Sequence, residues 1–290
     1  MAMQQIMVTT HVQAPIPIVW ERWNLPLHMM HWNQASPDWQ TTYAENDLRT
    51  GGKFCARMEA KDGSFGFDFG GTYDEVIPHE RIKYTMDDGR KVTTTFTVHA
   101  DKGVTVTNVF DAETQNPLEM QRGGWQAILD NFKSYAEKNI NNTPLHFEIE
   151  IQAPVEKVYE TMLHDKTYRE WTSIFNATSH FKGSWNKNEK ILFMGTDADG
   201  KEGGMMSRIK ENIPFKFVSI EHLGLINGEE EITSGETVDS WAGALENYSF
   251  HSLHTGTLLQ VDTDCNENYK NYFMETWPKA LHKLKSICEN

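Results

Sequence analysis

Two histidines stand at a spacing that could hold a metal ion. His28 and His31 lie three residues apart in a segment with a helical pattern, and this spacing can direct two imidazoles at one cation. No third ligand follows at a recognisable spacing, so a role in lining a cavity, in capping a helix or in ordinary packing stays open for His28. We expect neither a metal site nor another cofactor.

Two glutamates recur in one sequence context. Glu75 and Glu211 each lie three residues before a proline. A carboxylate that projects into an apolar cavity has a raised pKa and can act as a general acid or anchor a ligand. A solvated position on a strand is the alternative, because a bulge near Gly70 and Gly71 would change the face of the strand that the side chain occupies.

Large apolar side chains supply the remaining candidates, and for each of them both core packing and cavity lining are open. Phe67 lies in an alternating run with two other phenylalanines, which predicts that all three share one face of a strand. With His28 and the two glutamates, the candidates for a cavity lining are Trp32, Phe54, Phe67, Tyr73, Trp125, Leu129, Phe132, Trp171, Phe193, Trp277 and Leu281. Nucleophilic triads, phosphate-binding glycine loops and Cys-x-x-Cys pairs are missing in recognisable form, so no residue is assigned as catalytic.

The elements that must position these residues occur twice. Residues 12–20 and 151–159 share a Gln-Ala-Pro core, and Trp32 and Trp171 keep the same separation of 139 residues. Trp125 and Trp277 are 152 residues apart, which indicates an insertion in the second copy, over about residues 227–242. We therefore expect two domains, residues 1–140 and 145–290, and a polar linker over residues 139–144.

Each copy has the same order of predicted elements. An alternating strand is followed by two short helices, about six strands joined by short turns, and a long helix with one apolar stripe. Such a stripe has to pack on a sheet, so the long helix is expected to lie across the strands. In the second copy Pro278 falls inside this helix. We expect a kink there, or a new helix start near Trp277.

Charge and composition narrow the classes of function. The formal net charge of −14 argues against binding of nucleic acid, which requires clustered Lys and Arg, and against anionic membranes. No stretch approaches the roughly 18 apolar residues of a membrane span, and the first residues lack the pattern of a signal peptide. The three cysteines are far apart and suggest no disulfide framework. We expect a cytoplasmic protein, monomeric or homodimeric.

The order of elements resembles the helix-grip fold of the Bet v 1-like, START-like or SRPBCC superfamily. Local motifs resemble the family named after the activator of Hsp90 ATPase, over nearly all of residues 6–138. The residues that carry this resemblance are Ala14-Pro15, Val19-Trp20, Leu27-His28, Trp32, Gly51-Gly52-Lys53-Phe54, residues 71–82, Gly124-Trp125 and Leu129. The second copy matches more weakly, with Lys190-Ile191 in place of the double glycine.

The resemblance implies an α+β chain of two tandem helix-grip domains. Each would have a curved antiparallel sheet of about seven strands wrapped around a long C-terminal helix, and members of the superfamily bind lipids, hormones or polyketides between the two. We accordingly expect non-catalytic binding of a small hydrophobic molecule, in the first domain. One alternative is a protein-interaction module that regulates an Hsp90-type chaperone ATPase. The other is a cyclase-like or hydrolase-like enzyme, which requires polar groups converging in the cavity.

Overall fold

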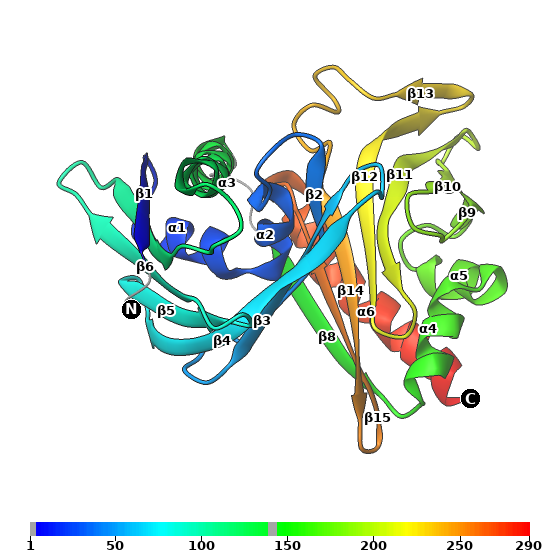
Figure 1. Ribbon diagram of the computed structural model, residues 1–290. Coiled ribbons are helices and arrows are strands. Elements are labelled where there is room, and N and C mark those ends of the chain that lie inside the picture. The colour runs from blue at the N-terminus through cyan, green and yellow to red at the C-terminus, as the bar shows by residue number, and fades with distance from the viewer. Residues whose placement is uncertain (1–3, 139–143) are drawn as a thin grey trace. The chain divides into compact units, whose positions relative to one another are not determined.

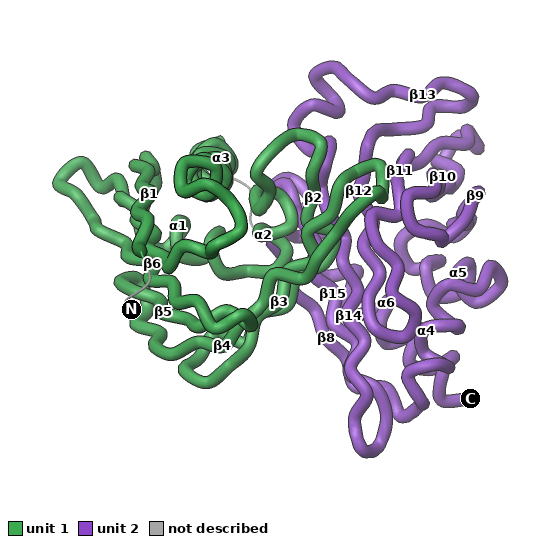
Figure 2. The backbone as a smooth tube through the Cα atoms, in the orientation of Figure 1, with its two compact units in different colours: residues 1–140 green, residues 141–290 purple. Residues whose placement is uncertain are grey.

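The computed structural model describes residues 4–138 and 144–290. The chain divides into two compact units, Met1–Ile140 and Asn141–Asn290 (Figure 2). All but the last residue of the expected linker, residues 139–144, lies outside the described residues. Each unit is described by itself.

The first unit is built on a seven-stranded antiparallel sheet in the order β1-β7-β6-β5-β4-β3-β2 (Figure 1). Its strands are β1 (Gln5–Val12), β2 (Trp39–Asn46), β3 (Lys53–Ala60), β4 (Gly66–Ile77), β5 (Arg81–Met86), β6 (Lys91–Val98) and β7 (Val104–Asp111). Its helices are α1 (Ile16–Asn24), α2 (Pro26–Trp32) and α3 (Leu118–Lys138). The expected order of elements is confirmed.

Prolines set the corner between β1 and the two short helices. Pro15 occupies the N-cap of α1 with a φ of −61°, and Pro26 opens α2 directly after Leu25. Proline suits the first turn of a helix because its φ is already helical and its missing N–H would be unpaired there. The long helix α3 then buries Leu129, Phe132 and their neighbours in one hydrophobic core with the inward-facing residues of the sheet.

The second unit repeats this plan with eight strands in one sheet, in the order β8-β15-β14-β12-β11-β10-β9 and with β13 paired to β12. The strands are β8 (Leu145–Ile151), β9 (His180–Gly183), β10 (Lys190–Thr196), β11 (Glu202–Ile213), β12 (Phe217–Asn227), β13 (Glu230–Ile232), β14 (Leu245–Leu253) and β15 (Gly256–Thr263). The helices are α4 (Val155–Leu163), α5 (Asp165–Thr172) and α6 (Glu267–Glu289). The additional strand β13 comes from the insertion that the repeat offset indicates.

Helix α6 runs through Pro278 from Glu267 to Glu289. The expectation of a new helix start near Trp277 is therefore wrong. A proline inside a helix costs about 3 kcal/mol, whereas each large apolar side chain that becomes buried contributes about 1.5–3 kcal/mol. Trp277 and Leu281, on either side of the proline, are both buried in the core, and together they offset the cost. Among the described residues no helix is long and apolar enough to cross a membrane.

Candidate functional site

The interior of the first unit, between the sheet and α3, is walled by aromatic rings. Trp125 of α3 stacks on Phe110 of β7 with ring centroids 4.0 Å apart. Phe132 and Leu129 are fully buried. The ring centroids of Phe132 and Trp32 are 5.0 Å apart, in a T-shaped arrangement. These candidate residues thus lie together, and in this structure their side chains pack against one another.

A second group of candidates lies on β3 to β5. Phe54 contacts the rings of Tyr73 at 5.1 Å and Tyr84 at 4.9 Å. The Tyr73 hydroxyl donates to Asn46 Oδ1 at 2.8 Å. Burial raises the pKa of the Tyr73 phenol well above its usual value, so this group stays a neutral hydrogen-bond donor.

Besides Thr10 of β1, two neighbouring polar side chains lie in the apolar floor of this interior. Thr94 of β6 and Asn108 of β7 are cross-strand partners, 0% and 4% exposed, on the sheet face that carries core residues Phe96 and Phe110. Thr94 Oγ1 and Asn108 Oδ1 have no hydrogen-bond partner among the described residues. Leaving a buried polar atom unpaired costs about 1–3 kcal/mol, and native structures rarely tolerate it. The pair therefore marks a place where a further polar group fits.

In the second unit, Val261 takes the place of Asn108. The correspondence follows from strand pairing: Asn108 pairs with Val8, and Val261 pairs with Phe147, which lies 139 residues after Val8. Tyr248 is the partner of Val261 on the next strand, as Thr94 is of Asn108. Tyr248 and Val261 are both buried in the second core. At this place the second unit therefore has no unpaired polar pair, although Ser219 Oγ and Trp277 Nε1 are buried without a hydrogen-bond partner elsewhere among its described residues.

His28 lies at the junction of three helices. It is 2% exposed, its Nδ1 lies 2.7 Å from the Tyr135 hydroxyl of α3, and its Nε2 lies 3.7 Å from Glu21 Oε1. The neighbouring His28 side chain lowers the pKa of Glu21. Beside it, the buried Arg22 donates to the Ala136 carbonyl at 2.7 Å, in the last turn of α3, where the helix dipole favours a cation. Among the described residues no three side chains are grouped to hold a metal ion.

The structure does not place Glu75 in the interior. A bulge between Tyr73 and Glu75 shifts the strand register, and Glu75 Oε1 accepts from Arg81 at 2.7 Å and lies 3.1 Å from Lys83 Nζ. These cations lower the pKa of Glu75, opposite to the shift expected in an apolar cavity. Glu211 follows the equivalent bulge in β11 and lies 2.6 Å from Lys187 Nζ.

Phe67 is likewise outside the core. Its side chain is 40% exposed and forms a cluster with Phe65, 63% exposed, and with Trp39 at centroid distances of 5.9–6.4 Å. Phe69, two residues further along the same strand face, reaches Trp125 at 6.1 Å. Phe67 and Phe69 share one face of β4, whereas Phe65 precedes the strand. This face extends beyond the area that α3 covers.

The candidates of the second unit are core residues. Trp171 donates through Nε1 to the Met162 carbonyl at 3.0 Å, and Trp277 stacks on Phe147 at 5.8 Å. Leu281 is 2% exposed. Phe193 packs half-buried against this core, among further aromatic rings of α5 and the β9–β10 connection.

A row of three polar side chains, which the sequence did not reveal, lies in the same unit. Ser207 Oγ is 2.9 Å from His222 Nδ1, and His222 Nε2 is 3.7 Å from Glu246 Oε2. Hydroxyl, imidazole and carboxylate in this order can activate a nucleophile. Ser207 is 0% exposed, however, so a substrate has no access to its hydroxyl in this structure. The three residues come from three strands, and only the sheet register brings them together.

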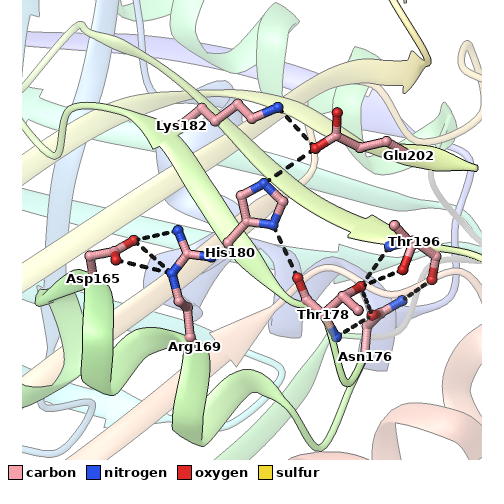
Figure 3. A network of polar contacts seen from close by, with 8 residues as sticks. All are labelled: Asp165, Arg169, Asn176, Thr178, His180, Lys182, Thr196 and Glu202. Carbon is pink, nitrogen blue, oxygen red and sulfur yellow. Dashed lines mark hydrogen bonds and ion pairs between the residues drawn. The ribbon is translucent and has the colours of Figure 1, made fainter. Parts of the chain in front are cut away.

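An exposed polar network ties the segment after α5 to the sheet (Figure 3). Glu202 Oε1 accepts from Lys182 Nζ at 2.9 Å and lies 3.4 Å from His180 Nε2. Asn176 Nδ2 donates to the Thr196 carbonyl at 3.0 Å. The Lys182 ammonium lowers the pKa of Glu202, and the network acts as a clamp on the β9–β11 edge rather than as a reactive site.

Two surface grooves lie outside both sheet–helix interiors. One, of about 480 Å³, is lined by apolar residues of β11, β12 and β13, including Met205, Leu225 and Ile232. The other, of about 360 Å³, runs between strand β8 and helix α6.

Comparison with known proteins identifies the first unit. Residues 13–137 match the family model described as activator of Hsp90 ATPase homolog 1-like protein. An AHSA1-like protein from Aeromonas hydrophila is 46% identical over 46% of this chain and 92% of its own, with a TM-score of 0.44. A protein from Cytophaga hutchinsonii is 50% identical over 48% of this chain and 94% of its own, with a TM-score of 0.41. No curated protein matches the sequence.

A likeness over the whole chain concerns the fold alone. The di-domain ARO/CYC protein StfQ, from the steffimycin biosynthetic pathway, is 13% identical over 98% of both chains, with a TM-score of 0.54. This likeness extends the helix-grip fold to both units. The chain therefore belongs to the activator of Hsp90 ATPase homolog 1-like family and carries two helix-grip domains in tandem.

Proposed function

We propose that the first unit binds, without catalysis, a small hydrophobic molecule that carries one neutral hydrogen-bonding group. The observation that carries this proposal is the unpaired polar pair, Thr94 Oγ1 and Asn108 Oδ1, in a largely apolar interior. A ligand group placed between them would recover the free energy that their burial costs.

The chemistry of the pair restricts the ligand. A threonine hydroxyl both donates and accepts, and an asparagine oxygen accepts, so a ligand hydroxyl is the group that satisfies both. A charged group would be costly, because burying an ion without a partner is strongly unfavourable. The stacked rings of Trp125 and Phe110 at the wall favour a flat ring or an acyl chain beside that hydroxyl.

Entry of a ligand requires Trp125 of α3 to move away from Phe110, and two glycines in α3 favour such movement. Gly123 and Gly124 directly precede Trp125, and a Cβ at either glycine would meet no atom within 4 Å. Packing therefore does not demand glycine there, while each glycine costs the helix about 1 kcal/mol relative to alanine. The turn that carries Trp125 is accordingly less stable than the same turn with alanine would be.

The test replaces the pair by apolar groups of similar shape, Thr94→Val with Asn108→Leu. Protein purified from its own host is examined by native mass spectrometry for a retained small molecule, and 2-naphthol is compared with 2-methylnaphthalene as a fluorescence probe. We expect wild type to bind the naphthol at least tenfold more tightly and the variant to lose that preference. The matched control is Thr257→Val, an equally buried threonine of the second unit, whose hydroxyl donates to the Ala153 carbonyl. Equal binding of both probes by wild type would contradict the proposal.

Regulation of an Hsp90-type chaperone ATPase is the second candidate, and the exposed cluster of Trp39, Phe65 and Phe67 favours it. Exposed aromatic groups of this kind mark protein-interaction sites. If this function holds, Phe65→Ser with Phe67→Ser should abolish stimulation of ATP hydrolysis by the chaperone of the same host. Met7→Ser is the control, since Met7 is 58% exposed but lies on β1, away from the cluster. Stimulation that is absent in wild type, or unchanged in the variant, rejects this candidate.

A further inference from the structure

In the first unit, side chains of α3 close the edge of the sheet. Strand β1 lies at this edge, and within residues 4–138 its only hydrogen-bonded neighbour strand is β7. Gln126 Nε2 donates to the Thr9 carbonyl at 3.1 Å, and the Thr9 N–H donates to Gln126 Oε1 at 3.4 Å. Arg122 donates to the Met7 carbonyl at 2.9 Å. The outward backbone groups of Thr9 and the Met7 carbonyl are thereby paired, which hinders the addition of a further strand at this part of the edge.

The same contacts can be followed into the second unit by the two repeat offsets. Glu137 accepts from the Gln13 N–H at 2.8 Å, and its counterpart Glu289, 152 residues later, accepts from the Gln152 N–H at 2.8 Å. Gln152 lies 139 residues after Gln13. This contact near the end of the long helix is thus conserved between the two copies, which establishes the register of the comparison.

The contacts that Arg122 and Gln126 make with the edge strand are lost in the second unit. The position of Gln126 is taken by Pro278, and that of Arg122 by Met274. Neither side chain can donate a hydrogen bond to a backbone carbonyl, and proline cannot accept one from an N–H. The residue that corresponds to Thr9 is Glu148, and no side chain within residues 144–290 bonds its backbone N–H or C=O. Lys285 of α6 donates to the Glu150 carbonyl at 2.7 Å, so within residues 144–290 the edge of β8 is open at Glu148 and is closed beyond it.

A groove lies at this opening. It has a volume of about 360 Å³ between β8 and α6. Its apolar lining includes Ile149, Pro278 and Leu281. Glu148 and Glu150 of β8 contribute its acidic part, and His282 and Lys285 line it on the side of α6. The Glu148 side chain is 56% exposed. An open edge, an apolar groove and two carboxylates thus occur together.

We propose that this edge takes up an extended peptide segment with alternating basic and apolar residues, which pairs with β8 as an additional strand. In such β-augmentation the backbone hydrogen bonds supply affinity, and alternate side chains supply specificity. Apolar residues of the added strand would face Pro278 and Leu281, and basic residues would lie beside Glu148 and Glu150 on the other face. The formal net charge of −14 adds long-range attraction for a basic partner.

A second copy of this chain fits the edge poorly. Pairing two β8 strands would bring the carboxylates of Glu148 and Glu150 from both copies side by side on one sheet face. Like charges in cross-strand positions are destabilising. The occupant is therefore a different, basic chain.

The experiment uses the full-length protein and a fluorescein-labelled ten-residue peptide of alternating Lys and Val, followed by fluorescence anisotropy. The control peptide has the same side chains and charge but carries N-methyl groups on alternate backbone amides, so that it cannot donate hydrogen bonds to β8. We expect the unmodified peptide to bind at least tenfold more tightly than the N-methylated one. Equal binding of the two peptides would show attraction by charge alone and overturn the proposal, as would no binding of either.

Matched protein variants test the edge itself. Pro278→Gln reinstates the side chain that closes the edge in the first unit and should weaken binding at least tenfold, while the thermal stability of the second unit rises. Pro278→Ala removes the proline ring without adding a side chain that can bond the backbone of β8. It should keep peptide binding within about twofold of wild type. Glu148→Gln with Glu150→Gln should weaken binding and reduce its salt dependence. If Pro278→Gln folds and binds as Pro278→Ala does, the open edge is not the site.

Discussion

Replacing Gly123 and Gly124 of α3 by alanine should stabilise the first unit. Both glycines lie inside the helix, neither has a positive φ, and a Cβ at either position would meet no atom within 4 Å. Glycine is worse than alanine inside a helix by about 1 kcal/mol, because it loses more backbone freedom on folding. The double replacement should therefore raise the free energy of unfolding by about 2 kcal/mol. For a unit of about 140 residues this corresponds to a Tm increase of roughly 6–10 °C.

The assay is urea denaturation of the full chain, with the unit assigned from hydrogen exchange of the α3 amides. Gly71→Ala is the contrasting control. A Cβ there would lie 2.5 Å from the Thr85 carbonyl oxygen, so this replacement should destabilise the same unit. The double alanine variant should also slow the dissociation of a bound 2-naphthol, because the turn before Trp125 opens less often. A variant with an intact α3 but unchanged or reduced stability would refute this account of the two glycines.

Three further predictions concern packing, charge and thiol reactivity. Phe132→Ala should lower the free energy of unfolding by about 3–5 kcal/mol, because its ring is fully buried, whereas Met120→Ala, 67% exposed, should change it by less than about 0.5 kcal/mol in the same denaturation assay. Neighbouring cations lower the pKa of Glu75 in the folded state, so its contribution to the free energy of unfolding is present above the ordinary carboxyl pKa of 4.5 and is lost as pH falls through the lower folded value. Glu75→Gln should therefore be less stable than wild type at pH 7 and equally stable in acid. A difference in stability that persists in acid would contradict this. Burial raises the pKa of Cys265 to about 11, so this thiol should not react with a disulfide reagent at pH 7 until the protein is unfolded.

Part of this protein can be predicted from its sequence because the signals are local. The Gln-Ala-Pro repeat, the strand alternation and the apolar stripe of each long helix depend on residues close in the chain, and they correctly predicted two helix-grip units. The stripe also identified Leu129 and Phe132 as residues packed between helix and sheet. The family motifs lie within these same local segments of the first unit.

Strand pairing decided what the local signals left open. Glu75 turned away from the interior because a bulge against β5 shifts its register, and the pairing partner of a strand is not encoded beside it. The polar pair Thr94 and Asn108 depends on the register of β6 with β7 in the same way. Helix α6 continued through Pro278 because burial of its two flanks outweighs the local cost.

The edge of the second sheet combines both kinds of information. The sequence by itself determined that Pro278 replaces Gln126 at the repeat offset of 152 residues. Only the tertiary structure showed that Gln126 bonds the backbone of β1, since that contact joins residues 117 positions apart. A residue's chemical type is local, but the groups that it satisfies or leaves open are set by which distant strand the helix lies against.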